Sequence, residues 1–256
     1  MRKVQKMEIV SQNEIARNIF ELVLKGDLVK TMLAAGQFVN VKVSSVQTPL
    51  LRRPISICEI DHEHNQLTLI YRAEGEGTTV LSQRRPGEEV DILGPLGTGY
   101  GLDGISPSET VLLVGGGIGV PPMFETARQL KARGNRVIAV LGFSSGEDVF
   151  YEEKFASYGD VHVATMDGSR GFKGHVVQLI QEKGISFDTV LGCGPKVMLA
   201  AIEAEFGSTK KGFLSFEERM ACGIGACYAC VCQTVSGKQA RICKEGPVFK
   251  LGEVVL

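Results

Sequence analysis

Four cysteines between residues 222 and 243 place the strongest constraint on how this chain can fold. Cys222, Cys227 and Cys230 occur at the spacing C-x4-C-x2-C, and Cys243 follows later in the sequence. Three thiolates on one short loop can converge on an inorganic core, and this spacing is typical of loops that wrap a [2Fe–2S] cluster. Two glycines inside the loop supply the backbone freedom that such a wrap requires. The pattern therefore predicts a [2Fe–2S] site with these four cysteines as its ligands.

Two other interpretations of the cysteines are weaker. Structural zinc sites favour paired C-x2-C units, and this chain has only one such pair. A disulfide framework is typical of small secreted domains, and the N-terminal residues lack the long apolar core of a signal peptide.

Cys232 follows two residues after Cys230 and would face the same side of a strand. We interpret it as a small buried apolar residue and leave it outside the predicted site.

Length and composition exclude several classes of protein. The chain has 256 residues, enough for two compact domains and an appendage, and its 44% hydrophobic and 22% charged residues are those of a globular protein. A net charge of −1 provides no electrostatic footprint for nucleic acid, and no apolar run approaches membrane-spanning length. Because most of the seven cysteines lie in one cluster, we expect a reducing, cytoplasmic location.

Residues 1–101 have the pattern of a small β-barrel. Turn signals separate six short strands with no long helix between them, which favours a closed antiparallel arrangement. The expected strands cover residues 6–10, 18–24, 37–43, 55–60, 66–72 and 89–93.

Two stretches of this predicted barrel are suited to binding phosphate. Arg52 and Arg53 stand at a strand start, where guanidinium groups can bind phosphate in a bidentate manner. Residues 77–81, which begin Gly-Thr-Thr, favour a short helix whose N-terminus would receive a pyrophosphate. Each feature alone is a weak signal, but both occur in one domain. Together they predict a nucleotide cofactor on the barrel.

After residue 106 the pattern changes to alternating strands and helices. Residues 111–114 form a continuous apolar run, as expected of a strand buried on both faces. The glycine loop 115–119 and a helix over 123–132 follow, and this order of strand, glycine loop and helix forms a diphosphate cradle. The loop lacks the G-x-G-x-x-G fingerprint, so an ordinary Rossmann dehydrogenase is not implied.

The alternation predicts a doubly wound parallel sheet, which binds ligands at the carboxyl ends of its strands. Further strands are expected over 136–142, 160–165, 189–192 and 212–216, and helices over 151–158, 174–183 and 196–206. Cys193 lies at one such strand end, in a Cys-Gly-Pro sequence. Arg170, in the loop 167–171, could place a guanidinium beside an adenosine 2′-phosphate, so the choice between NAD and NADP stays open.

These motifs resemble those of the ferredoxin–NADP reductase superfamily. The resemblance implies FAD on the barrel, with an arginine on its phosphate and a serine near the isoalloxazine ring, and a nicotinamide dinucleotide on the glycine loop. The family often has tyrosine where Ile55 stands, and Tyr71 could contact the flavin elsewhere. The Cys-Gly-Pro sequence resembles the turn that contacts nicotinamide, which implies a catalytic role for Cys193. The predicted FAD-binding residues are Arg53, Pro54, Ile55, Ser56, Ile70, Tyr71, Arg72, Gly77, Thr78 and Thr79, and the predicted dinucleotide-binding residues are Gly115, Gly116, Gly117 and Gly119.

The order of the three parts, with the sequence EERMACGIGAC that begins at Glu217, resembles the electron-transfer subunits of type B dihydroorotate dehydrogenases over essentially the whole chain. The resemblance implies a multidomain fold: an FAD-binding antiparallel β-barrel domain over 1–101, an NAD-binding α/β domain over 102–209 and a small [2Fe–2S] domain over 210–256. It also implies a partner, the FMN-containing catalytic subunit, in a heterotetramer. Electrons would pass from FMN through the cluster and FAD to NAD⁺ in pyrimidine biosynthesis. The sequence offers no base for deprotonating dihydroorotate, so this chain alone is not expected to oxidise it.

Two alternatives remain. One is a reductase subunit of another NAD(P)H-dependent ferredoxin-type oxidoreductase, such as the small subunit of NADH-dependent ferredoxin–NADP oxidoreductase. In that family a carboxylate replaces one cluster thiolate, so four cysteines favour the dihydroorotate enzyme. The other is a non-catalytic module that binds zinc and a nucleotide, which the colour of the purified protein would distinguish. The sequence leaves partner stoichiometry, redox potentials and physiological direction open.

Overall fold

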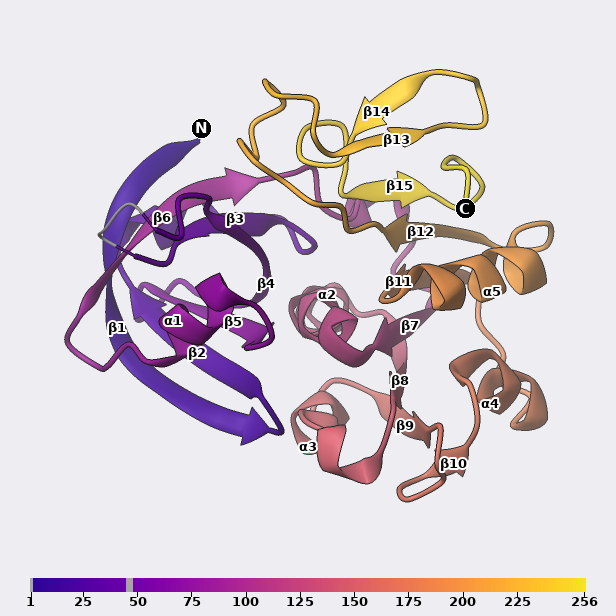
Figure 1. Ribbon diagram of the computed structural model, residues 1–256. Helices are drawn as coiled ribbons and strands as arrows, with labels where there is room; N and C mark the ends of the chain where they lie inside the picture. The colour runs from indigo at the N-terminus through magenta and orange to yellow at the C-terminus, as the bar shows by residue number, and fades with distance from the viewer. Residues whose placement is uncertain (1, 45–47) are drawn as a thin grey trace.

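The computed structural model describes residues 2–44 and 48–256, which form a closed barrel, an α/β sheet and a C-terminal segment beside both (Figure 1). The predicted antiparallel barrel is confirmed, with strand order β1-β2-β5-β4-β3-β6. Its strands are β1 (Lys3–Ala16), β2 (Ile19–Lys25), β3 (Phe38–Lys42), β4 (Arg53–Asp61), β5 (Gln66–Arg72) and β6 (Glu89–Leu96). A 3₁₀ turn (Asp27–Thr31) and helix α1 (Glu76–Ser82) interrupt the run of strands.

Alternation along β3 shows how the barrel is filled. Val39 and Val41 are fully buried in the apolar interior of the barrel. Because successive side chains of a strand point to opposite faces, Phe38 and Asn40 lie on the outer face. Phe38 there joins a second apolar cluster with residues of the sheet and of the C-terminal segment. The outside of β3 is therefore an internal surface of the whole molecule.

The α/β part is a seven-stranded sheet with strand order β10-β9-β8-β7-β11-β12-β15. Alternate residues of β7 are buried on opposite faces, with Val111 and Leu113 in one cluster and Leu112 and Val114 in the other. This two-sided burial explains the continuous apolar run in the sequence. The strands are β7 (Thr110–Gly116), β8 (Arg136–Phe143), β9 (Asp160–Thr165), β10 (Phe172–Lys173), β11 (Thr189–Cys193), β12 (Lys211–Ser215) and β15 (Val248–Lys250).

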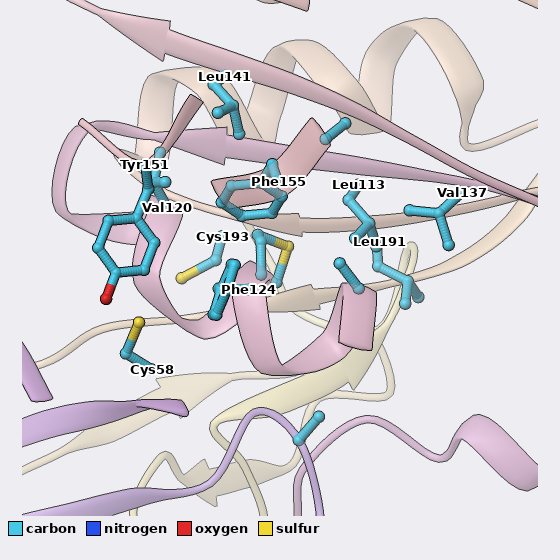
Figure 2. Packing of buried hydrophobic residues seen from close by; sticks show 14 of the residues in the cluster. Cys58, Leu113, Val120, Phe124, Val137, Leu141, Tyr151, Phe155, Leu191 and Cys193 are labelled. Carbon is cyan, nitrogen blue, oxygen red and sulfur yellow. The ribbon is translucent and has the colours of Figure 1, made fainter. Parts of the chain in front are cut away.

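Helices cover both faces of this sheet, as the alternating pattern predicted. Helices α2 (Val120–Ala132) and α3 (Glu152–Ala156) lie on the side of the barrel, and α4 (Val176–Glu182) and α5 (Lys196–Phe206) lie on the other side (Figure 1). Phe124 of α2 makes edge-to-face contacts with the rings of Tyr151, Phe155 and Tyr158, at centroid distances of 5.0, 5.3 and 5.3 Å. Figure 2 shows Phe124 and Phe155 within this packed layer.

The sheet differs from the expected purely parallel one in one strand. Strand β12 pairs parallel with β11, as expected for residues 212–216, although the sequence placed the end of the α/β domain at residue 209. Strand β15, from the C-terminal segment, pairs antiparallel with β12 and forms the sheet edge. We therefore propose that the cluster segment begins after Ser215 and that it contributes its own strand to the sheet.

Hydrogen bonds from an ion pair on α2 to one barrel residue join the barrel and the sheet. Glu125 of α2 is fully buried, and its Oε1 lies 2.8 Å from Arg128 Nη2. Glu125 Oε2 accepts a hydrogen bond from the Ile60 N–H at 3.1 Å, while Arg128 Nη2 donates to the Ile60 carbonyl at 2.9 Å. Both backbone groups of one barrel residue are thus held by a single helix of the sheet. This contact fixes how the faces of the two parts meet.

The C-terminal segment is built around the cysteine loop and the hairpin β13 (Val231–Gln233) with β14 (Gln239–Arg241). Its buried residues Cys230, Ile242 and Cys243 pack in the same apolar cluster as Phe38 of the barrel and Phe249 of β15. The segment therefore shares a core with both larger parts. No helix among the described residues is long and apolar enough to cross a membrane.

Candidate functional site

A cavity of about 260 Å³ lies where the outer face of the barrel meets the sheet and the C-terminal segment. The predicted flavin residues that line it are Pro54, Ile55, Ser56, Ile70, Tyr71, Arg72 and Thr78. Its other wall comes from the glycine loop, from the end of β12 at Ser215 and from the chain after it, including Phe216 and Met220. The Tyr71 hydroxyl donates to Gln12 Oε1 at 2.9 Å, and desolvation raises the pKa of this phenol. Residues from two predicted motifs and from later parts of the chain thus form one pocket.

The two predicted phosphate-binding features lie against each other. A Cβ atom added at Gly77 would lie 2.4 Å from Arg53 Nε, so only glycine lets α1 approach this guanidinium so closely. The Arg52 guanidinium already has protein partners. Its Nη2 lies 2.9 Å from Asp91 Oδ1, and its Nη1 donates to two backbone carbonyls. Thr79 is exposed on α1 and does not line the cavity. Arg53 is therefore the better placed of the two arginines for a cofactor phosphate.

A larger cavity, of about 780 Å³, opens at the carboxyl ends of the parallel strands. This is the position expected for a ligand of an open α/β sheet. Gly116 and Gly117 line it, and Gly117 has a φ of +52°, which favours glycine. Gly115 and Gly119 do not line it and instead permit close packing. A Cβ at Gly119 would lie 2.3 Å from the carbonyl oxygen of Cys193. Other lining residues are Phe143, Ser144, Asp148, Met166, His175, Gln178, Gly194, Pro195 and Met198.

Cys193 is placed beneath this cavity rather than in its lining. Its side chain is 1% exposed and lies among the buried apolar residues that Figure 2 shows beside Phe124. Desolvation raises the pKa of the thiol. The neighbouring Gly194 and Pro195 reach the cavity instead. Direct contact of Cys193 with nicotinamide therefore stays a prediction, and the rest of its turn occupies the lining.

The arginine considered for a 2′-phosphate is engaged elsewhere. Arg170 Nη2 lies 2.6 Å from Glu152 Oε2, and Arg170 does not line the large cavity. An acidic residue that lines it, Asp148, accepts hydrogen bonds from Arg17 at 3.0 Å and from the Ser145 hydroxyl at 3.1 Å. A carboxylate, rather than a free guanidinium, therefore stands at this part of the lining.

The two cavities adjoin. Arg72, Ile118 and Glu217 line both of them, and they come from the barrel, the glycine loop and the chain after β12. Desolvation by the surrounding protein raises the pKa of the Glu217 carboxyl. A flavin ring in one cavity and a nicotinamide in the other would therefore meet at these three residues.

The cysteine loop directs its backbone toward sulfur. The Cys222 Sγ accepts hydrogen bonds from the N–H groups of Ile224, Ala226 and Cys227 at 3.4, 3.3 and 3.4 Å. Desolvation opposes ionisation of this thiol, but these donors outweigh it and lower the pKa of Cys222 to about 6. Gly223 and Gly225 have φ values of +68° and +84°, which let the loop turn its amides inward. This donor set suits a thiolate ligand of an iron–sulfur cluster.

The four predicted ligands lie as two pairs. The Cys227 side chain lies close enough to Cys222 to lower the pKa of that thiol, and the Cys243 N–H donates a hydrogen bond to Cys230 Sγ at 3.4 Å. Over residues 2–44 and 48–256, no three His, Cys, Asp or Glu side chains gather as a ligand set for one metal ion. Two thiol pairs fit a cluster of two irons, which takes four cysteines. Cys232 lies in β13, opposite Ala240.

Comparisons with known proteins agree with this geometry. The family model for the iron–sulfur cluster binding domain of dihydroorotate dehydrogenase B matches residues 217–255, and that for the oxidoreductase FAD-binding domain matches residues 2–100. Proteins from Geobacillus sp. (strain WCH70) and Bacillus mycoides (strain KBAB4) are 55% and 53% identical, with 100% of both chains covered. Both are named dihydroorotate dehydrogenase B (NAD(+)), electron transfer subunit. The chain belongs to this family.

The predicted family, with its FAD-binding and iron–sulfur domains, is therefore confirmed. Among solved structures, the NADH-dependent reduced ferredoxin-NADP oxidoreductase matches this family member with a TM-score of 0.87 and 28% identity, covering 97% of this chain and 89% of that chain. A cytochrome P450 reductase from Amycolatopsis matches with a TM-score of 0.66 at 19% identity, over 81% of this chain and 67% of that one. The second likeness shows the fold alone.

Sequence reasoning missed several lining residues. Met166 and Phe143 follow or end parallel strands, so the rule that ligands bind at carboxyl strand ends could have identified them. Glu217 belongs to the EERMACGIGAC motif but was not predicted to line a cavity, because nothing in the sequence shows that it lies between two cavities. Asn40 gave no sequence signal, because a polar residue on a strand is usually solvated.

Proposed function

We propose that this chain is the electron-transfer subunit of an NAD-dependent dihydroorotate dehydrogenase and links a [2Fe–2S] cluster, FAD and NAD⁺ in one series. The observation that carries this proposal is the order of sites in space. The dinucleotide cavity and the flavin cavity share Arg72, Ile118 and Glu217. The cysteine loop packs closely against the barrel: a Cβ atom added at Gly223 would lie only 2.5 Å from Asn40 Nδ2 of β3. The flavin site is thus flanked by the other two.

The proposed cofactor contacts follow from this placement. Arg53, beside Gly77 and Thr78, would hold an FAD phosphate, and Pro54, Ile55 and Ser56 would line the flavin ring. Gly116 and Gly117 would admit the diphosphate of NAD. When bound, the cluster moves single electrons, whereas FAD collects two and exchanges hydride with nicotinamide. The protein positions these groups at the junction of the two cavities.

The proposed partner is an FMN-containing subunit that oxidises dihydroorotate in the cytoplasm, assembled with this chain as a heterotetramer. The relatives' name, electron transfer subunit, requires a catalytic partner for those proteins. Cys227, Ile224 and Tyr228 are exposed on the cysteine loop, with Ile224 40% and Tyr228 60% exposed. An exposed apolar surface beside a one-electron carrier is suited to docking a redox partner. We therefore place the partner at this loop.

A second candidate is a reductase subunit of another NAD(P)H-dependent ferredoxin-type oxidoreductase. The observation that supports this candidate is the TM-score of 0.87 to the NADH-dependent reduced ferredoxin-NADP oxidoreductase structure. Both candidates would pass electrons between a dinucleotide, FAD and a cluster. They differ in the partner that exchanges electrons at the cysteine loop.

Co-purification and assay of the native complex test the proposal. We expect the purified chain to carry FAD and iron, to reduce an artificial acceptor with NADH, and to leave dihydroorotate unchanged. Its native partner should contain FMN, and the complex should reduce NAD⁺ with dihydroorotate. A ferredoxin-dependent partner would support the second candidate, and dihydroorotate oxidation by the isolated chain would contradict the first. Native mass determination of the complex tests the heterotetramer.

A further inference from the structure

Asn40 is the most unusual buried polar residue outside the cavities. Its side chain is 0% exposed. Neither its Nδ2 nor its Oδ1 has a hydrogen-bond partner among the described residues. A buried polar group left without a partner destabilises the folded protein. A carboxamide in this position therefore needs a partner that protein atoms alone do not supply.

The surroundings of Asn40 identify the direction of that partner. Asn40 lies on the outer face of β3, since its neighbours Val39 and Val41 are buried inside the barrel. A Cβ at Gly223 would lie 2.5 Å from Asn40 Nδ2, so the amide packs directly on the backbone of the cysteine loop. Gly223 follows Cys222, whose sulfur already accepts three backbone N–H groups. The unpartnered donor thus lies beside a loop whose other donors point at sulfur.

The register of the barrel also places Asn40 next to the flavin cavity. Asn40 pairs with Pro54 of β4, and directly paired residues of antiparallel strands share a face of the sheet. Pro54 lines the flavin cavity. Asn40 therefore lies between that cavity and the cysteine loop, on the route that the proposed function gives to electrons.

We propose that Asn40 Nδ2 donates a hydrogen bond to a sulfur atom of the [2Fe–2S] site and thereby raises its reduction potential. This inference rests on the proposed function, because it requires the cluster. Hydrogen bonds to cluster sulfurs are among the factors that set the potential. A donor stabilises the reduced cluster more than the oxidised one, since the added electron increases negative charge on sulfur. Asn40 is thus a positioning and tuning residue supplied by the barrel.

Two substitutions at this position separate donor from acceptor. Asn40→Leu keeps a similar volume and removes both polar atoms. Asn40→Asp, measured at a pH at which its carboxyl is ionised, keeps the shape and the acceptor but removes the donor. Thr68→Val is a matched control, because Thr68 is a buried polar residue of β5, which pairs with β2 and β4 rather than β3. Each protein is measured for iron and sulfide content, thermal stability, and cluster midpoint potential by EPR-monitored titration.

We expect Asn40→Leu to assemble the cluster and to disfavour its reduction about tenfold, which for a one-electron couple is about 59 mV. Asn40→Asp should lower the potential at least as far, because it adds an acceptor and negative charge. Thr68→Val should leave the potential unchanged.

Three results would overturn this role. One is an unchanged potential in both Asn40 variants. The second is a wild-type potential in Asn40→Asp, because this would show that Oδ1 acts only as an acceptor for the loop. The third is a loss of thermal stability in Asn40→Leu without a change in potential, which would show packing alone. If instead the wild-type protein binds no iron and sulfide, the proposed function itself fails.

Discussion

The α/β sheet and the cysteine segment are held together by different forces. Every residue of the apolar run in β7 is fully buried, on both faces of a sheet that helices cover. The cysteine segment has strands of only three residues, and its buried side chains belong to a cluster shared with the barrel and the sheet. A segment of this size cannot bury a sufficient core of its own. Apolar burial therefore specifies the sheet, whereas ligand binding and neighbouring surfaces specify the segment.

The largest effect that separates the two regions is loss of the cluster. Serine at Cys222, Cys227, Cys230 or Cys243 removes one ligand, and we expect each variant to lose the cluster because all four thiols are needed. Cys232→Ser is the matched control and should keep iron, sulfide and the reduced EPR signal. The sheet should stay folded in all five variants, as measured by FAD content and circular dichroism. Loss of the cluster in Cys232→Ser alone would refute the ligand assignment.

The second effect is the reverse of the first: the sheet is destabilised and the cluster is kept. Phe124→Ala removes a ring that contacts three other aromatic rings in the packed layer beside the sheet. We expect it to lower the free energy of unfolding by about 3–5 kcal/mol, as large-to-small core substitutions do. Leu33→Ala, at a residue 72% exposed, should cost almost nothing. Denaturant unfolding measures both, and iron content per folded protein should be unchanged. A cost below that of Leu33→Ala would contradict the assignment of the core.

A third effect extends the comparison to the barrel, where two adjacent arginines have different environments. Arg53→Ala should weaken FAD binding by about 1.5–3 kcal/mol, or roughly 10- to 150-fold, because it removes a charge-assisted contact. Arg52→Ala should instead lower stability, since Arg52 pairs with Asp91. Titration of the apoprotein with FAD and with FMN measures the affinities. Equal FAD affinity in Arg53→Ala and wild type, or tighter binding of FMN, would contradict the phosphate site.

The smallest effect concerns an ion pair on the sheet. Desolvation opposes ionisation of Glu109, but hydrogen bonds from Lys211, Thr189 and the Ser106 N–H outweigh it and lower its pKa from 4.5 to about 2. A carboxyl whose pKa is lower in the folded state than in the unfolded state stabilises the fold at pH values above its unfolded-state pKa. This contribution is lost as the pH falls from about 4.5 through about 2.

Glu109→Gln should therefore cost up to about 1 kcal/mol at pH 7, as ion pairs at the protein surface do, and progressively less below pH 4.5. Glu89→Gln is the control, because its pair with Lys6 at 3.6 Å is exposed on both sides. Urea unfolding at several pH values measures the difference. A cost that grows toward low pH would reverse the predicted sign.

The elements that sequence analysis predicted well are those with strong periodicity. Strands β5 and β9 and helix α5 have the expected bounds, because apolar spacing and turn residues agree there. β10 was missed, since two residues carry no period. β15 was missed for a related reason: three residues pair with a strand far earlier in the chain, and only tertiary packing selects that partner.

The site divides in the same way. The cysteine spacing and the glycine loop could be recognised because the chemistry restricts residue type and order. Two other features could not be recognised from the sequence: Glu217 lines both cavities, and Asn40 packs against Gly223. Both arise where three separate parts of the chain meet. Likewise, the sequence could not show that Gly119 serves packing against Cys193 rather than the cavity lining.

The central claim is that electrons reach NAD⁺ only through the cluster, and reconstitution with the FMN-containing subunit tests it most directly. Wild-type chain and Cys227→Ser are each combined with that subunit, and two activities are measured in parallel. These are reduction of NAD⁺ by dihydroorotate and reduction of an artificial acceptor by NADH. We predict that wild type supports both, and that Cys227→Ser keeps the second and loses the first. Reduction of NAD⁺ by dihydroorotate in the cluster-free complex would contradict the account.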